Sequence, residues 1–343
     1  MVRPHRFPTG KVPSDALRRL VFGRLGVPTG RLLQGPRVGE DAAVIDMGDR
    51  VIVVATDPIT GAIGNVGWLA VHINANDVAS TGARPSWFLC AALLPEGADE
   101  GLLDEIMGQI HEACCEVGVS LVGGHTETTP GLDRPILVGF MMGEAERDGY
   151  VTTGGARPGD AVVLTKGAGI EGTAVLAQDL AGVLREQVGD DVVQAAASMI
   201  RRISVVPEAM KAMEVGGVHS LHDPTEGGLL NGIWEMTEAA GVGVRIVEEA
   251  IPVAEETRTI CGALGIDPLK LMGSGALLIA VETRKAKELV SELRAIGVEA
   301  SVIGMILKQK SRVLIRTDGS ETRIEAVDQD EVYRILDEYG MTG

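Results

Sequence analysis

Residues 67–85 read GWLAVHINANDVASTGARP, the most informative pattern in the chain. The apolar spacing predicts a helix over residues 67–81, with Gly82 just beyond its end. Four polar residues interrupt the apolar pattern of this helix: His72, Asn74, Asn76 and Asp77. A core helix does not need so many polar groups. The pattern therefore leaves two interpretations, a helix that lines a binding site or a polar stripe that faces a domain interface.

The segments around this helix predict an α+β unit. Short β-rich stretches predict strands at residues 43–45, 51–55, 86–94, 119–122 and 135–143, and amphipathic spacing predicts a helix over 99–117. Residues 144–160 then read EAERDGYVTTGGARPGD, which is turn-rich and poor in apolar residues. We therefore predict a domain boundary in this stretch.

The second half of the chain again mixes strands and helices. Strands are predicted at residues 161–165, 220–223, 243–247, 276–281, 300–303 and 312–317. Helices are predicted at residues 172–180, 192–200, 207–215, 228–240, 283–296 and 330–339. Because strands and helices do not alternate strictly, the pattern favours two α+β domains whose sheets are covered on one face by helices.

Charge and composition exclude several classes of partner. The chain has 343 residues and a net charge of −17, which disfavours nucleic acid and anionic membrane surfaces because both attract basic proteins. No apolar run reaches the ~18–20 residues of a membrane span. The four cysteines form no C-x-x-C pair, and a low cysteine content fits the reducing cytoplasm, which is the predicted location.

Carboxylates recur near the ends of predicted strands. Gly39, Glu40 and Asp41 precede one strand, Asp57 ends the next, and Asp77 lies on the polar helix. Magnesium prefers carboxylate oxygens next to phosphate oxygens, and such a site draws one or two acids from each of several elements. The three aspartates therefore fit a magnesium site, although each acid taken singly is typical of a turn or a helix cap.

Two glycine-rich segments are candidates for anion binding. Residues 122–129 read VGGHTETT, a strand that runs into two glycines, hydroxyl groups and an acid, as in an anion-binding turn. Residues 222–228 read HDPTEGG and open a helix, whose N-terminus favours a phosphate or a carboxylate. Asp223 or Thr225 also fits a plain N-cap. Lys11 and Lys166 have the charge to neutralise a phosphate, or are ordinary solvated lysines.

The ordered set of motifs resembles one enzyme superfamily. In chain order the motifs are GEDAAVI at 39–45, TD at 56–57, NANDVASTGARP at 74–85, GGHTETTPG at 123–131, RPGDAVVLTKGAG at 157–169 and HDPTEGGL at 222–229. This set is similar to that of the aminoimidazole ribonucleotide (AIR) synthase or PurM-related superfamily, which includes thiamine-monophosphate kinase and selenophosphate synthetase. The resemblance is strongest to the hydrogenase maturation family HypE, and it runs from about residue 10 to about residue 308.

The resemblance implies an AIR synthase-like two-domain α+β fold. An N-terminal domain for ATP and magnesium binding and for dimerisation is expected over residues 1–150. A C-terminal α/β sandwich is expected over residues 151–310, followed by a C-terminal extension over residues 311–343. Two chains would pair through their N-terminal sheets into a β-barrel-like core, so the expected assembly is a homodimer.

The resemblance also implies ATP and Mg²⁺ as cofactors and assigns residues to them. The implied metal ligands are Asp41, Asp57, Asp77 and Glu127. The implied ATP- or phosphate-binding residues are Asn76, Gly123, Gly124, His125, Thr126 and Lys166. Asp223 and Thr225 are expected at the acceptor, and no catalytic base is assigned. The implied reaction is ATP-dependent phosphorylation or activation of an amide, carboxyl or phosphate acceptor, either a small molecule or part of a protein.

The chain departs from the family pattern at three points. HypE acts on a group carried by its own C-terminal Cys, whereas this chain ends DEYGMTG and has no Cys after Cys261, which disfavours that carrier role. His125 stands where HypE and the kinase carry Asp. HDPTEGG lacks the Ser-Asp-Gly signature of the kinase, which disfavours thiamine phosphate as substrate. The alternative function is a non-catalytic nucleotide-binding protein or a maturation scaffold.

Overall fold

The first unit of the computed structural model, which describes residues 7, 10–60 and 64–340, is built on a six-stranded sheet. The strand order is β1-β2-β3-β6-β4-β5, and all neighbours are antiparallel except β4 and β5. The bounds are β1 Leu32–Gln34, β2 Ala43–Asp46, β3 Arg50–Ile59, β4 Arg84–Leu94, β5 Ser120–Thr128 and β6 Ile136–Glu146. A short helix, α1 (Ser14–Leu20), precedes the sheet.

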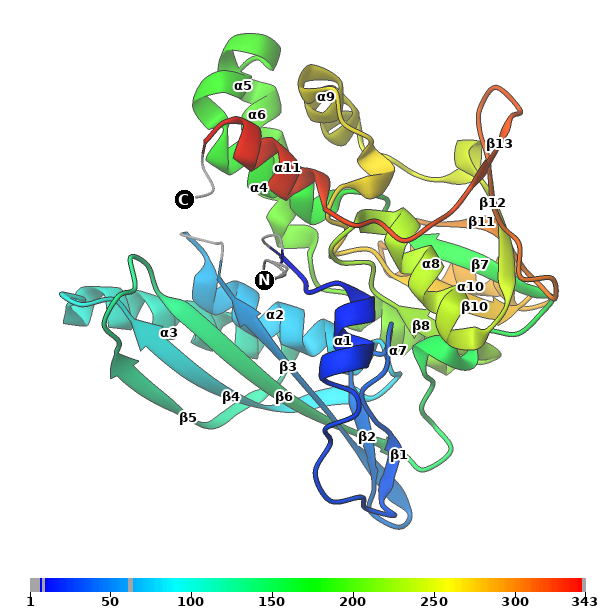
Figure 1. Ribbon diagram of the computed structural model, residues 1–343, viewed down its shortest axis with the longest axis horizontal. Coiled ribbons are helices and arrows are strands. Elements are labelled where there is room, and N and C mark those ends of the chain that lie inside the picture. Colours follow the sequence, from blue (N-terminus) through cyan, green and yellow to red (C-terminus); the bar gives the residue numbers. More distant parts are fainter. Residues whose placement is uncertain (1–6, 8–9, 61–63, 341–343) are drawn as a thin grey trace, which may run out of the picture.

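Two helices cover one face of this sheet, as Figure 1 shows. All residues of α2 (Val66–Ala79) are buried, and α3 (Glu100–Val117) packs beside it. The side chain of Asp99 accepts the backbone N–H of Leu102 and so begins α3, whereas the left-handed Gly118 ends it. Because α2 lies between the sheet and the second unit, its polar residues face protein rather than solvent.

The opposite face of the first sheet is only half-buried. Along β4 and β6, buried residues alternate with residues of intermediate exposure, as expected for strands with one covered face. β5 lies at the edge of the sheet, and all nine of its residues are exposed. An exposed edge strand leaves backbone N–H and C=O groups without a strand partner on one side.

The second unit contains a seven-stranded sheet. Its order is β13-β12-β9-β11-β7-β10-β8, and only β12 and β9 run parallel to each other. The bounds are β7 Asp160–Thr165, β8 Val218–His222, β9 Gly243–Val247, β10 Leu278–Glu282, β11 Ala300–Leu307, β12 Arg312–Ile315 and β13 Glu321–Arg323. With the first sheet, this confirms the predicted α+β fold of two units.

Both faces of the second sheet are covered, which corrects the expectation of helices on one face only. All six residues of β7 are buried. On one face, Val163 packs in a cluster with residues of α7 (Val206–Val215) and α10 (Ala286–Ala295). On the other, Val162 joins a cluster that includes α8 (Gly228–Ala240). Strands buried on both faces lose the alternation of polar and apolar residues, so periodicity alone cannot reveal the second layer.

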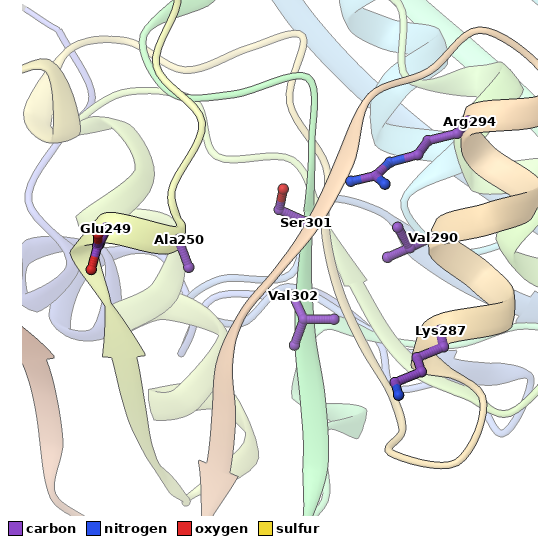
Figure 2. Close-up of a pocket in the computed structure, with 7 residues that line it drawn as sticks. All are labelled: Glu249, Ala250, Lys287, Val290, Arg294, Ser301 and Val302. Carbon is purple, nitrogen blue, oxygen red and sulfur yellow. The ribbon is translucent and has the colours of Figure 1, made fainter.

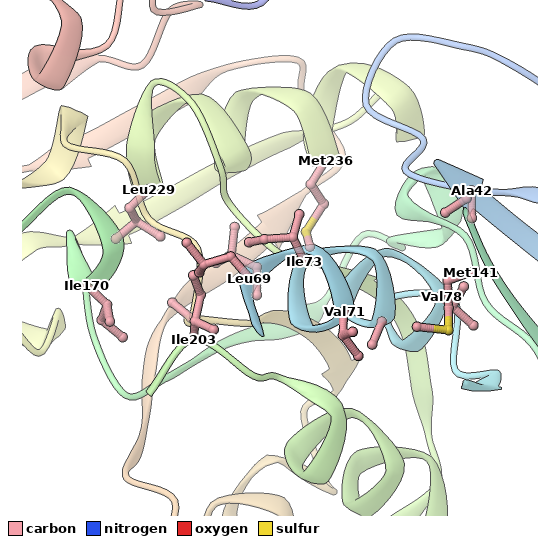
Figure 3. Close-up of a cluster of buried hydrophobic side chains, with 14 of the residues drawn as sticks. Ala42, Leu69, Val71, Ile73, Val78, Met141, Ile170, Ile203, Leu229 and Met236 are labelled. Atoms are coloured by element: carbon pink, nitrogen blue, oxygen red, sulfur yellow. The ribbon is translucent and has the colours of Figure 1, made fainter. Parts of the chain in front are cut away.

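One buried apolar cluster crosses from the first unit into the second. It contains Leu69 and Ile73 from α2 together with Leu229 and Met236 from α8. Figure 3 shows these side chains around α2, with Ile73 directed toward Met236. Because the packed interior is shared, the two units hold a fixed relation to each other, and residues from both can build one site.

The remaining helices form a small group on the second unit. They are α4 (Ile170–Asp179), α5 (Ala181–Val188), α6 (Asp190–Ser198), α9 (Glu255–Leu264) and α11 (Glu331–Glu338). The segment expected as an extension is integrated here, because β12 and β13 extend the second sheet and α11 packs on α4 (Figure 1). None of the helices in the described residues is long and apolar enough to cross a membrane.

Candidate functional site

Four aspartates lie near the junction of the two units, with three of them within electrostatic range of Asp77, and we call Asp41, Asp57, Asp77 and Asp223 the acidic cluster. Burial raises the pKa of Asp77 well above its ordinary value, and the charges of Asp57, Asp223 and Asp41 raise it further. Burial also raises the pKa of Asp57 to about 6, although the nearby positive charge of Lys11 opposes this. The structure therefore brings three of the four predicted metal ligands within electrostatic range of one another and of a predicted acceptor residue.

Asp223 has an unusual environment for a carboxylate. Its side chain follows β8 and is 1% exposed. One oxygen, Oδ1, accepts a hydrogen bond from Ser80 Oγ at 3.0 Å, whereas the buried Oδ2 has no hydrogen-bond partner within the described residues. Burial, reinforced by the charge of Asp41, raises the pKa of Asp223 to about 8. A buried oxygen in this state needs a proton or a cation to offset its desolvation.

A buried histidine joins Asp41 to the second unit. His222 Nδ1 lies 2.9 Å from Asp41 Oδ2, and its Nε2 lies 3.1 Å from Glu235 Oε2. Burial alone would lower the pKa of His222, but the two carboxylates outweigh it and hold this pKa well above its ordinary value. The charged imidazole thus orients Asp41. The prediction from HDPTEGG did not include His222 or Glu235, because their pairing depends on the tertiary fold.

Lys11 brings a positive charge to the cluster. Its ammonium lies 3.8 Å from Glu235 Oε1, and its side chain as a whole is 53% exposed. The carboxylate of Glu235 is the main cause of its raised pKa, with smaller contributions from Asp41 and Asp57. This geometry agrees with a lysine that can meet an anionic ligand, the role considered for Lys11 from the sequence.

Asn74 explains how Asp57 is held in place. Its Oδ1 accepts the backbone N–H of Asp57 at 2.8 Å, and its Nδ2 donates to the carbonyl of Asp57 at 3.2 Å and to that of Ala70 at 2.8 Å. The amide thus fixes the backbone of β3 beside α2. His72, by contrast, contacts α3, with its Nε2 3.0 Å from Glu116 Oε2.

Asn76 faces the domain interface, which is one of the two interpretations that the sequence left open. Its Nδ2 donates to the carbonyl of Ile203 at 2.8 Å, and its Oδ1 accepts the N–H of Val205 at 2.9 Å. Glu40 has a similar role, because its carboxylate accepts the N–H groups of Thr153 and Gly154, each at 3.1 Å. Both side chains bind backbone of the neighbouring segment in this structure.

The ammonium of Lys166 is also held by contacts within the protein. Its ammonium donates to the carbonyls of Arg202 at 2.9 Å and Ser204 at 2.6 Å, and it lies 2.7 Å from Glu208 Oε1. Its side chain is 10% exposed, and burial lowers its pKa. The ammonium is therefore not directed at the acidic cluster. Thr225 contacts its own loop, because its carbonyl accepts the N–H groups of Gly228 and Gly273.

Residues 123–128 form part of a strand, which corrects the prediction of an anion-binding turn. β5 continues through them because it pairs with β4 in parallel, and this pairing overrides the turn tendency of two glycines. His125 is level with Ala91, Val138 and Pro58 across the sheet. Three strand spacings of about 4.8 Å put His125 roughly 14 Å from β3.

Glu127 lies on the same exposed strand, and its Oε2 is 3.1 Å from His125 Nε2. In the sheet register, Asp57 shares a row with Gly139, Cys90 and Gly124. Side chains of successive residues alternate between faces, so His125 and Glu127 point away from the face that carries Asp57 and α2. Within one chain, neither residue reaches the acidic cluster.

An open pocket on the second unit has a different character. It has a volume of about 430 Å³ and is lined by Glu249, Ala250, Lys287, Val290, Arg294, Ser301 and Val302 (Figure 2). It shares no residue with the acidic cluster. Arg294 donates to the carbonyl of Ala300 at 2.9 Å and so serves the local backbone. Raised pKa values at neighbouring carboxylates, here Asp57, Asp77 and Asp223, are a stronger indication of a functional site, so we assign the candidate site to the acidic cluster.

Comparisons with known proteins agree with this arrangement. Residues 39–145 match the AIR synthase related protein N-terminal domain, and residues 157–316 match the corresponding C-terminal domain. A putative hydrogenase expression/formation protein of Methanocaldococcus jannaschii is 29% identical over 90% of this chain and 91% of its own. The carbamoyl dehydratase HypE of Azotobacter vinelandii is 31% identical over 79% of this chain and 80% of its own.

A solved structure has the same fold. The hydrogenase maturation protein HypE in complex with ATP superimposes with a TM-score of 0.72 and 24% identity, and the match covers 95% of this chain and 98% of that one. Both units of the present chain are included in this match. On the domain matches, the relatives and the shared fold, the chain belongs to the AIR synthase-related (PurM) superfamily and is similar to its HypE members.

Proposed function

We propose that this protein is a magnesium-dependent enzyme that uses ATP to phosphorylate or activate an amide, carboxyl or phosphate acceptor. The acceptor is either a small molecule or a group carried by a protein. The observation that carries the proposal is the buried, unpartnered Oδ2 of Asp223, in a cluster where burial and neighbouring carboxylates raise the pKa values of Asp57, Asp77 and Asp223. The HypE of similar fold binds ATP, which supports a nucleotide as ligand.

The donor set of the acidic cluster fits magnesium. Asp41, Asp57, Asp77 and Asp223 supply the carboxylate oxygens that a hard cation prefers, and the bare Oδ2 of Asp223 gains a partner when a cation binds. Within the described residues, no three His, Cys, Asp or Glu side chains already converge as a metal site. Magnesium usually takes only one or two carboxylates and completes its shell with water and phosphate oxygens. The phosphates of a bound nucleotide would therefore supply the remaining oxygen ligands at the acidic cluster.

The chain's own residues then have distinct tasks. The aspartates would hold magnesium, which offsets the charge that develops on the transferred phosphoryl group. His222 would keep Asp41 oriented, and the ammonium of Lys11 would meet the phosphates. A phosphate placed on an amide oxygen turns that oxygen into a good leaving group, which permits dehydration or cyclisation of the acceptor.

We also propose that the protein acts as a homodimer that pairs through its first sheet. The exposed β5 and the half-buried apolar face beside it support this pairing. In such a dimer, residues 123–127 of one copy would serve the acidic cluster of the other, since His125 and Glu127 point away from the face that carries Asp57 in their own chain. The proposed phosphate role of Gly123, Gly124, His125 and Thr126, and the proposed metal role of Glu127, depend on this second copy.

Calorimetric titration of ATP, with and without Mg²⁺, tests the proposal. Binding should require Mg²⁺ and should be lost when Asp41, Asp57 and Asp77 are changed to Asn. Asp133→Asn, at a side chain that is 84% exposed, is the matched control and should bind as the unchanged protein does. Unchanged affinity in the triple variant would refute the site. Mg²⁺-dependent binding without ATP turnover in a screen of amide, carboxyl and phosphate acceptors would favour the non-catalytic alternative.

A further inference from the structure

Three segments that are far apart in the sequence meet at the carboxylate of Glu226. Its Oε2 accepts the backbone N–H of Lys11 at 2.7 Å, and its Oε1 accepts the hydroxyl of Tyr333 at 3.2 Å. Gly10 completes the junction, because a Cβ at this position would lie 2.8 Å from both Glu226 Oε2 and the ring of Tyr333. The N-terminal segment, the 222–228 loop and the C-terminal helix α11 are therefore fitted to one another.

Asp330 fastens α11 to the same loop. Its side chain is 3% exposed and begins the helix by accepting the N–H of Val332 at 2.8 Å. It also accepts the N–H of Gly227 at 2.6 Å, immediately after Glu226, and that of Met272 at 3.3 Å. The hydrogen bond to Gly227 fixes α11 relative to the loop. The hydroxyl of Tyr333 consequently has a defined position beside Glu226.

The junction leads directly to the acidic cluster. Lys11, whose backbone is held by Glu226, has its ammonium 3.8 Å from Glu235, and Glu235 contacts His222, which contacts Asp41. A lysine on a chain segment near the N-terminus has many conformations, and each anchor that removes some of them lowers the entropy cost of binding an anion. Here the anchor is a hydrogen bond to the lysine's own N–H.

We propose that Glu226 and Tyr333 are positioning residues that place Lys11 for the phosphates of the nucleotide. The C-terminal helix is thus part of the phosphate-binding machinery. The C-terminal domain match ends at residue 316, so this assignment adds a segment beyond it. The inference rests on the proposed function, because it requires a nucleotide at the acidic cluster. Tyr333 acts through Glu226, and Glu226 acts through Lys11.

Calorimetry with two probes, Mg²⁺–ATP and AMP, separates positioning from a general loss of structure. AMP lacks the outer phosphates that Lys11 would meet. We expect Lys11→Met to weaken ATP binding about tenfold and Tyr333→Phe, which removes only the hydroxyl, to weaken it about threefold, with AMP binding unchanged in both. The double variant should bind ATP no more weakly than Lys11→Met alone, because Tyr333 acts through this lysine. Tyr339→Phe, at an exposed tyrosine just after α11, is the control and should match the unchanged protein.

Hydrogen exchange provides a second measurement. Exchange of the backbone N–H groups of residues 10–12 should become faster in Glu226→Ala and Tyr333→Phe, and stay unchanged in Tyr339→Phe. The inference is overturned if Tyr333→Phe binds ATP as tightly as the unchanged protein, if both probes weaken equally, or if the effects of the two single variants add in the double variant. Failure of the unchanged protein to bind Mg²⁺–ATP would instead refute the proposed function itself.

Discussion

Changing Asn76 to Ala tests whether this residue is a structural clamp. The side-chain amide makes two buried hydrogen bonds, to the carbonyl of Ile203 at 2.8 Å and from the N–H of Val205 at 2.9 Å. Asn76 itself is 0% exposed, so water cannot replace the lost partner without entering the interface. Each backbone group left buried and unpaired costs about 1–3 kcal/mol, so Asn76→Ala should lower the free energy of unfolding by about 3 kcal/mol.

This change is measurable by calorimetry and by denaturant unfolding of the metal-free protein. For a chain of 343 residues, a loss of about 3 kcal/mol corresponds to a fall in the melting temperature of about 4 °C. The matched control is Asn65→Ala, because Asn65 precedes α2 and makes no side-chain cap hydrogen bond. The clamp is refuted if the free energy of unfolding of Asn76→Ala lies within about 1 kcal/mol of that of the unchanged protein while its affinity for Mg²⁺–ATP falls. That result would instead indicate that Asn76 contacts the nucleotide.

Three further changes have distinct outcomes. Lys166→Met should lower the free energy of unfolding by about 3–5 kcal/mol, because Glu208 would stay buried without its cation. Lys287 is exposed, so Lys287→Met should have almost no effect in the same denaturant titration. Asp223 has its pKa raised to about 8, so the folded metal-free protein binds a proton that the unfolded chain has lost. Its contribution to stability is complete below pH 3.8, the ordinary pKa of an aspartate, and is lost as the pH rises to about 8. The melting temperature in chelator should therefore be higher at pH 6 than at pH 8. Asp223→Asn should reduce this difference. His222→Asn offers an amide nitrogen toward Asp41, whereas His222→Gln offers one toward Glu235. Titration with Mg²⁺–ATP should show about threefold weaker binding in His222→Asn and at least about tenfold weaker binding in His222→Gln. The reverse order would contradict the orienting role of His222.

The sequence points to the acidic residues of the candidate site more directly than to their contacts in the fold. Asp41, Asp57 and Asp77 lie near strand ends and on a helix with an unusual polar pattern, and both features are local. The partners of these residues are not local. Lys11 and Glu226 are 215 positions apart, and Tyr333 and Glu226 are 107 apart, so their pairing depends on how α1, α8 and α11 pack. No periodicity or motif encodes contacts of that separation.

Local patterns were also ambiguous where tertiary pairing decides the outcome. Helical spacing places His72 and Asn76 on one face of α2, but it does not show whether that face meets a ligand or protein. The second unit supplies the answer for Asn76, through the backbone at Ile203 and Val205. Likewise, Gly123 and Gly124 are typical of a turn, yet β4 offers a neighbouring strand along their whole length, and the segment becomes β5.

The acidic cluster lies where the two units share one core. Asp57 and Asp77 come from the first unit and Asp223 from the second, and the hydrogen bond from Ser80 to Asp223 crosses between them. The charges of Asp57, Asp223 and Asp41 act on Asp77, so when these groups are ionised their repulsion opposes the contact between the units. The clamps at Asn76 and Glu40 and the buried residues around α2 counteract that repulsion. Under the proposed function, a metal-free site held together by its surroundings would keep its oxygens in place, and the energy of cation binding would not be spent on assembling the site.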